Sequence, residues 1–356
     1  MRVLRPVSIV AGCLALAGSA AAQVSLTPPG TQTPPADSKS AKPQPKKPAA
    51  AKKPSALAPT APSTEPAPAA SAPAPTGPNV DLVYGAYQRG QYKTAFDLAT
   101  KRAQENNDPK AMTMLGELYA NALGIKRDEA KAAEWYKRAA DAGDREAMFA
   151  LAMLDLSGRG STAANREEGA KWLASSAKLG NPKAAYNLAL LYLDGQTFPQ
   201  DVRRAAELLR LAADAGNPEA QYALATFYKE GTGVEKSIDK AVRLLQAAAL
   251  ADNVDAEVEY AIALFNGTGT PKNQAAAVAL LRKAAKQNSP IAQNRLARVL
   301  VTGMGAPMDK IEGLKWHLVA KTAGKGDLML DEALAQASPE DRAKAEEAAR
   351  KWLGTK

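Results

Sequence analysis

Few residues of this chain have side chains suited to catalysis or metal binding. His317 is the only histidine and Cys13 the only cysteine. The N-terminal signal predicted below removes Cys13, so the mature chain cannot build a zinc site from His and Cys or a Cys–His catalytic pair. We expect no cofactor and no metal, and we expect His317, which follows Trp316, to be a packing or surface residue.

Two serine–lysine pairs have the spacing that penicillin-recognising enzymes use: Ser175-x-x-Lys178 and Ser237-x-x-Lys240. The partner sequences S-D-N and K-T-G of those enzymes do not accompany them. Chance explains such short matches better than catalysis does. A Ser–Lys hydrolase is therefore the second alternative to the function expected below, and the sequence predicts a protein that is not an enzyme.

The elements that carry these residues recur along the chain. An alanine recurs at the same position of every unit, and we use it as a marker. Successive marker alanines are 36 residues apart, except for one interval of 37. The marker positions are Ala111, Ala147, Ala184, Ala220, Ala256 and Ala292. A fixed period of this size predicts a repeat array, in which each unit buries its apolar face by stacking on the next.

Each unit has the pattern of two helices. In the central unit, Leu224, Ala225 and Tyr228 follow the marker Ala220 at spacings that place them close to one helix face. A glycine ends this first helix in most units, with Ala122 as the exception. The second helix ends four residues before the next marker, at residue types that tolerate φ > 0. These ends are Asn107, Gly143, Gly180, Gly216, Asp252, Asn288 and Gly324.

The residues of the first unit carry a family resemblance. The run G-E-L-Y-A-N-A-L-G-I from Gly116, followed by K-A-A-E-W-Y-K-R-A-A-D-A-G from Lys131 to Gly143, resembles a Sel1-like repeat, a longer-period relative of the tetratricopeptide repeats. The resemblance implies an all-α fold: a right-handed α-solenoid of about six helix-pair repeats over residues 109–325. We expect terminal capping helices at residues 79–108 and 326–356. Members of this family are mostly binding scaffolds.

The N-terminal residues indicate export. Residues 1–22 combine two arginines, an apolar core and a small-residue cleavage site ending at Ala22, as in a cleaved signal peptide. We therefore expect a periplasmic protein without a transmembrane helix in its mature form. A lipoprotein anchored at Cys13 is the less favoured alternative, because the apolar run continues beyond the cysteine. Residues 23–78 are rich in Pro, Ala and Lys and are expected to form a disordered linker.

The net charge of +9 lies mainly outside the repeats. Residues 1–78 carry eight basic and two acidic residues, a net +6, which leaves +3 for the remaining chain. A nucleic-acid-binding protein would show a strongly basic folded domain. We therefore expect no nucleic-acid partner, although the Lys/Pro-rich tail is suited to contact with the cell envelope.

The candidate partner-binding residues lie on the first helices. If the units pack as tetratricopeptide repeats do, the positions two and six residues after the marker alanine face or border a concave groove. In the central units these positions are mostly apolar and aromatic, which is typical of a binding hot spot, although the same aromatics are also suited to packing against the adjacent helix. The candidates are Phe149, Met153, Tyr186, Leu190, Tyr222, Thr226, Val258 and Ile262.

The sequence therefore predicts an exported, non-enzymatic scaffold or adaptor. Its partner would be a protein or peptide bound in the concave groove, with a role in envelope signalling or assembly. The first alternative is a protein that binds a cell-envelope polymer, either peptidoglycan or an acidic polysaccharide, through the basic tail and the groove aromatics.

Overall fold

The computed structural model describes residues 81–159 and 164–354. The predicted signal peptide at residues 1–22, Cys13 within it, and the predicted linker at residues 23–78 lie outside these residues.

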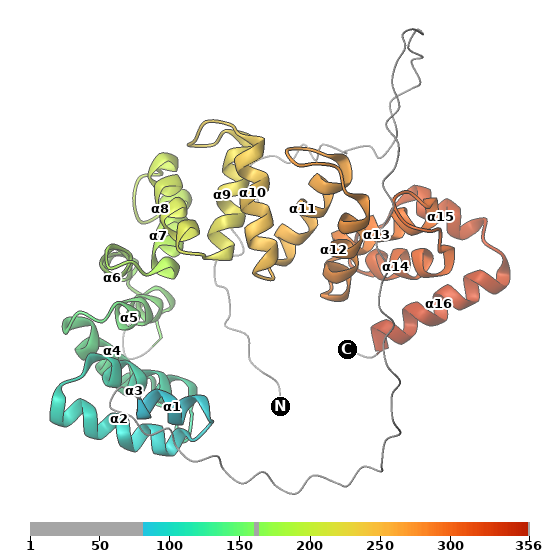
Figure 1. Ribbon diagram of the computed structural model, residues 1–356. Helices are drawn as coiled ribbons and strands as arrows, with labels where there is room; N and C mark the ends of the chain where they lie inside the picture. Colours follow the sequence, from blue (N-terminus) through green and yellow to red (C-terminus); the bar gives the residue numbers. More distant parts are fainter. Residues whose placement is uncertain (1–80, 160–163, 355–356) are drawn as a thin grey trace, which may run out of the picture. The chain divides into compact units, whose positions relative to one another are not determined.

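The described residues form sixteen α-helices and no strand (Figure 1). The all-α solenoid that the sequence predicts is therefore confirmed, with further helices at both ends of the repeats. The helices are α1 (Leu82–Gln88), α2 (Tyr92–Asn106), α3 (Pro109–Asn121), α4 (Glu129–Asp141), α5 (Arg145–Ser157), α6 (Arg166–Lys178), α7 (Pro182–Asp194), α8 (Val202–Asp214), α9 (Pro218–Glu230), α10 (Ile238–Leu250), α11 (Val254–Asn266), α12 (Gln274–Lys286), α13 (Pro290–Thr302), α14 (Lys310–Thr322), α15 (Leu328–Ala335) and α16 (Pro339–Gly354).

Consecutive helices pack against each other throughout the repeats. Each first helix (α3, α5, α7, α9, α11 and α13) contacts the second helix of its own repeat and the helix before it in the chain. The marker alanines lie at these crossings and are between 0% and 3% exposed. A methyl side chain lets two helices approach closely, which explains why alanine recurs at this position.

The first helices share one N-terminal cap. The residue three before the marker accepts a hydrogen bond from the marker's backbone N–H, as Asn217 does from Ala220 at 2.7 Å and Asn253 does from Ala256 at 2.9 Å. Four of the six first helices then begin with a proline, which has no N–H to leave unsatisfied. The sequence of each unit therefore fixes where its first helix begins.

The helix ends also follow the sequence. All seven residues predicted at the ends of second helices have positive φ, and so do the five glycines that follow first helices. The exception, Ala122, adopts the same conformation, with φ of 56°. The extra residue of the second repeat lies between the end of α5 at Ser157 and the start of α6 at Arg166, because eight residues separate these helices and seven separate α7 from α8.

The last helix packs on the last repeat. Helix α16 contacts α14, and Trp352 lies edge-on to Trp316 with ring centroids 5.1 Å apart. The Lys315 amine lies over both rings, at 4.2 Å and 5.0 Å from their centroids. Among the described residues, no helix is both long and apolar enough to cross a membrane.

Candidate protein-binding face

The predicted binding residues lie on four consecutive first helices, α5, α7, α9 and α11. We call this set of eight side chains the first-helix face: Phe149, Met153, Tyr186, Leu190, Tyr222, Thr226, Val258 and Ile262. Val258 and Leu190 are buried, at 4% and 9% exposure, so they offer almost no surface to a partner. The other six are half-buried.

Four half-buried side chains of this face, three of them aromatic, also contribute to the core. Phe149, Met153 and Tyr186 pack against the apolar cluster that joins α5 to α9, and Tyr222 packs against the cluster of α9 and α10. Each ring therefore has one side against the protein while part of its surface remains accessible. The packing role and the partner-binding role that the sequence suggested are compatible for these residues.

Carboxylates stand beside the two tyrosines of this face. Burial, and then the Glu219 carboxylate of the next first helix, raise the pKa of Tyr186. Burial, and then Glu259 and Asp255, raise the pKa of Tyr222 to about 12. Each tyrosine thus keeps its proton over the physiological range and has an acidic neighbour on the following first helix.

The charge of the repeats is divided between the two helix sets. The six first helices hold nine acidic and six basic residues, a net charge of −3. The six second helices hold seventeen basic and nine acidic residues, a net charge of +8. The small net charge of the array therefore conceals an acidic set of first helices and a basic set of second helices. Counting charges helix by helix in the sequence would have found this division.

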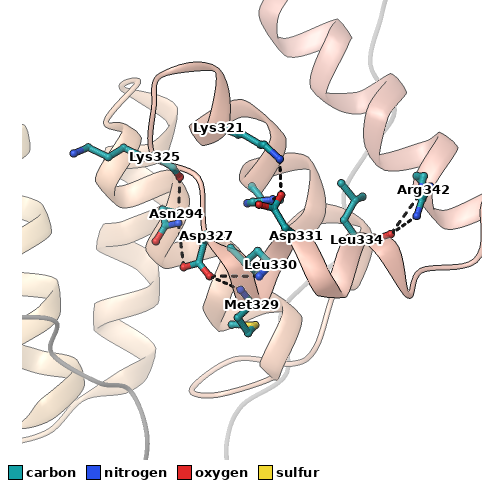
Figure 2. A network of polar contacts seen from close by, with 10 residues as sticks. Asn294, Lys321, Lys325, Asp327, Met329, Leu330, Asp331, Leu334 and Arg342 are labelled. Atoms are coloured by element: carbon teal, nitrogen blue, oxygen red, sulfur yellow. Dashed lines mark hydrogen bonds and ion pairs between the residues drawn. The ribbon is translucent and has the colours of Figure 1, made fainter.

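The C-terminal end of the first-helix series is polar. Asn294 and Arg298 of α13 both bind the Asp327 carboxylate. Figure 2 shows the Asn294 contact and the N-cap of α15, in which Asp327 accepts from the backbone N–H groups of Met329 and Leu330. Burial alone would raise the pKa of Asp327, but the hydrogen bond and charge of Arg298 outweigh it and lower the pKa. This network joins the last repeat to the terminal helices.

His317 occupies a core position of the repeat. The equivalent positions, eleven residues before each marker from Ala147 to Ala292, are Tyr136, Leu173, Leu209, Leu245 and Leu281, all of them buried. His317 is fully buried, and its Nε2 lies 2.9 Å from Asp331 Oδ1 of α15. The Lys321 amine donates to the same carboxylate at 2.6 Å (Figure 2). His317 is therefore a packing residue, and the sequence could not indicate Asp331 as its partner because α15 lies outside the repeats.

The two serine–lysine pairs have structural roles. Ser237 is the N-cap of α10, and its hydroxyl accepts from the backbone N–H of Lys240 at 3.4 Å. The Ser175 hydroxyl donates to the carbonyl of Lys171 at 3.0 Å, within its own helix. Within residues 81–159 and 164–354, no cluster of three His, Cys, Asp or Glu side chains is arranged to hold a metal ion.

The repeats match a known family model. Six consecutive segments fit the Sel1 repeat, at residues 109–144, 145–181, 182–217, 218–253, 254–289 and 290–325. The chain belongs to the Sel1 repeat family. Sel1 repeats are generally scaffolds for protein–protein interaction and are generally not enzymes.

Solved structures support the same fold. A Sel1 repeat protein from Oxalobacter formigenes is 27% identical, with a TM-score of 0.61, and the match covers 69% of this chain and 100% of that one. A protective antigen present in uropathogenic Escherichia coli strains, c5321, is 24% identical, with a TM-score of 0.52 and coverage of 76% and 67%. No curated protein matches the chain.

Proposed function

We propose that this Sel1 repeat protein is an exported, non-enzymatic scaffold that binds a protein or peptide partner on its first-helix face. The observation that carries the proposal is the series of half-buried apolar and aromatic side chains at equivalent positions of α5, α7 and α9. Aromatic rings that are already ordered lose little conformational entropy on binding, which is why they dominate binding hot spots.

Crosslinking in cells followed by mass spectrometry tests this proposal. The native protein is compared with a Phe149→Ala, Tyr186→Ala, Tyr222→Ala variant that circular dichroism shows to remain helical. A matched control, Leu211→Ala with Leu250→Ala, removes side chains that are 48% and 79% exposed on second helices. We expect one discrete protein partner that the control retains and the first-helix variant loses. Equal capture by both variants would contradict the proposal.

We further propose that the chain acts in the periplasm. The support is the signal-like sequence of residues 1–22. The mature protein should appear in the periplasmic fraction with Gln23 as its first residue, and Cys13→Ser should leave its size and location unchanged. Loss of membrane association in the Cys13→Ser variant would instead indicate a lipoprotein.

The surplus of positive charge on the second helices favours one alternative, binding to an acidic polymer of the cell envelope. This surplus is +8 over the six second helices. Cosedimentation with purified peptidoglycan, or with an acidic polysaccharide, tests this alternative. Binding that survives the first-helix substitutions and weakens when second-helix lysines are neutralised would support it over the scaffold.

A further inference from the structure

The two tyrosines of the first-helix face form a repeating unit with the acidic residues beside them. Tyr186 stands two residues after one marker alanine, and its acidic neighbour Glu219 stands one residue before the next marker. Tyr222 and Asp255 have the same relation one repeat later. The equivalent positions at the C-terminal end of the array, Asn294 and Asp327, are joined by a hydrogen bond of 3.4 Å, which shows that these two positions lie side by side. We call the two tyrosines and their two acidic neighbours the tyrosine–carboxylate stretch. It runs over α7, α9 and α11.

The two carboxylates of this stretch are available to a partner. Glu219 and Asp255 are exposed, and no cation of the described residues lies within ion-pair distance of either. Glu259, the third acidic residue near Tyr222, is different, because the Lys229 amine binds it at 3.1 Å. The stretch therefore presents two uncompensated negative charges, each beside a half-buried ring.

The charges on the surrounding helices also favour a positively charged ligand. The first helices of the six repeats carry a net charge of −3, whereas the second helices carry +8. Beyond the stretch, α13 carries Arg295 and no acidic residue, and its other cation, Arg298, is paired with Asp327. A cationic segment is thus attracted to α9 and α11 and is repelled from α13 and from the second helices.

We propose that the tyrosine–carboxylate stretch binds an extended segment of another protein that carries lysine or arginine side chains. This inference rests on the proposed function and names the chemistry of the partner. A cation here meets two attractive groups at once: a carboxylate that accepts its N–H groups, and an aromatic ring whose face attracts positive charge. The aliphatic stems of lysine and arginine cover the apolar part of the rings.

Fluorescence anisotropy with the full-length chain tests the inference. The probe is a fluorescein-labelled peptide of alternating serine and lysine, and its counterpart has glutamate in place of lysine. We expect the lysine peptide to bind and the glutamate peptide not to bind, with affinity that falls as salt is added. Glu219→Gln with Asp255→Asn should weaken binding by about tenfold, because each substitution removes one exposed ion pair with the peptide.

Matched variants distinguish binding at this site from nonspecific attraction of the peptide to negative charge elsewhere on the protein. Glu134→Gln with Asp214→Asn removes two exposed carboxylates from second helices and should leave the affinity unchanged. Tyr186→Phe with Tyr222→Phe keeps the ring faces and should bind as the native chain does. Equal affinity for the two peptides, or equal weakening by both pairs of charge variants, would overturn the inference.

The same variants distinguish failure of the inference from failure of the proposed function. If the cellular partner is lost with Tyr186→Ala and Tyr222→Ala but retained with Glu219→Gln and Asp255→Asn, the scaffold proposal stands and the cationic partner is wrong. If the partner is retained in all of these variants, both proposals fail.

Discussion

The middle and the ends of the array use one core position in different ways. The interior repeats place leucine there: Leu173, Leu209, Leu245 and Leu281. The first repeat has Tyr136, whose hydroxyl donates to Glu117 at 3.0 Å, and the last has His317, whose ring binds Asp331. An interior leucine has a repeat on both sides, whereas the terminal residues carry a polar group that finds a partner at the end of the stack.

This contrast shows how the array ends. At this position an interior repeat needs only apolar complementarity, because equivalent neighbours supply both surfaces. At the ends, a buried polar atom must be matched by a specific acceptor, which fixes one arrangement of the terminal elements. At Tyr136, burial and the Glu117 carboxylate raise the pKa of the hydroxyl, which therefore remains a donor.

One interior residue offers the severest test of this contrast. Glu257 is fully buried in α11, and Lys283 Nζ lies 2.6 Å from its Oε1. Lys283→Met would leave a buried charge without its cation, which costs about 3 kcal/mol of the free energy of unfolding. Urea denaturation measures the total loss, and hydrogen exchange at α11 and α12 shows whether it is local.

Glu257→Gln supplies the matched control. The equivalent residues Gln221 and Gln293 are glutamines that donate to the carbonyls of Ala213 and Ala285, at 3.2 Å and 3.1 Å. Glutamine at 257 should therefore be tolerated, and Lys283→Met should cost much less in that background. An equal cost in both backgrounds would show that the pair does not determine stability here.

Two substitutions would give the first repeat the alanine and leucine that the interior repeats have at the positions equivalent to 116 and 136. Tyr136 packs over Gly116, where the other repeats have alanine, and a Cβ at Gly116 would lie 2.5 Å from the Tyr136 ring. Gly116→Ala alone and Tyr136→Leu alone should each cost about 2 kcal/mol, one by overpacking and one by leaving a cavity. Together they recreate the interior pair, so the double variant should be close to the native free energy of unfolding. Additive losses in a double-mutant cycle would contradict this account.

A smaller effect is expected where the first repeat has an alanine at a positive-φ position that is glycine in the other repeats. Ala122 has φ of 56°, and the equivalent residue of the fourth repeat is Gly231, with φ of 83°. Ala122→Gly should raise the free energy of unfolding by about 0.5–1 kcal/mol, because glycine adopts this conformation without steric strain. Gly231→Ala should lower it by a similar amount. Thermal denaturation of both variants checks the sign.

The smallest expected effect concerns pH at the C-terminal end. The folded-state pKa of Asp327 lies below its unfolded value, so its contribution to stability is complete above pH ~4 and is lost as the pH falls further. Hydrogen exchange at α15, corrected for intrinsic rates, should therefore accelerate in acid. Asp327→Asn should weaken this dependence, and Asp331→Asn separates the contribution of Asp331, whose pKa Lys321 and then His317 lower. An unchanged acid response in Asp327→Asn would assign it to other groups.

The sequence predicted those features that repeat. The spacing of the marker alanines located every first helix, and residues such as Asn107, Asp252 and Asn288 correctly indicated positive φ at helix ends. Periodicity works here because each repeat meets the same packing problem. The His317–Asp331 pair was not predictable, because it joins a repeat to an element that occurs once.

The candidate face was predictable in register but not in exposure. The position of each side chain on its helix followed from the spacing, yet Val258 and Leu190 are buried whereas Tyr186 and Tyr222 are partly open. Exposure depends on the size of the neighbouring side chains on the adjacent helices, which differ from repeat to repeat. The structure therefore reduces the eight candidate residues to six that remain accessible. It also adds the acidic neighbours of Tyr186 and Tyr222 to the candidate face.

Site-specific photocrosslinking in cells shows whether the partner binds on the first helices. A photoreactive amino acid replaces Thr226 on α9 in one variant and Arg243, an exposed residue of the second helix α10, in another. We predict that a discrete protein adduct forms from position 226 and not from position 243. An adduct from position 243 alone would place the partner on the second helices and contradict this account.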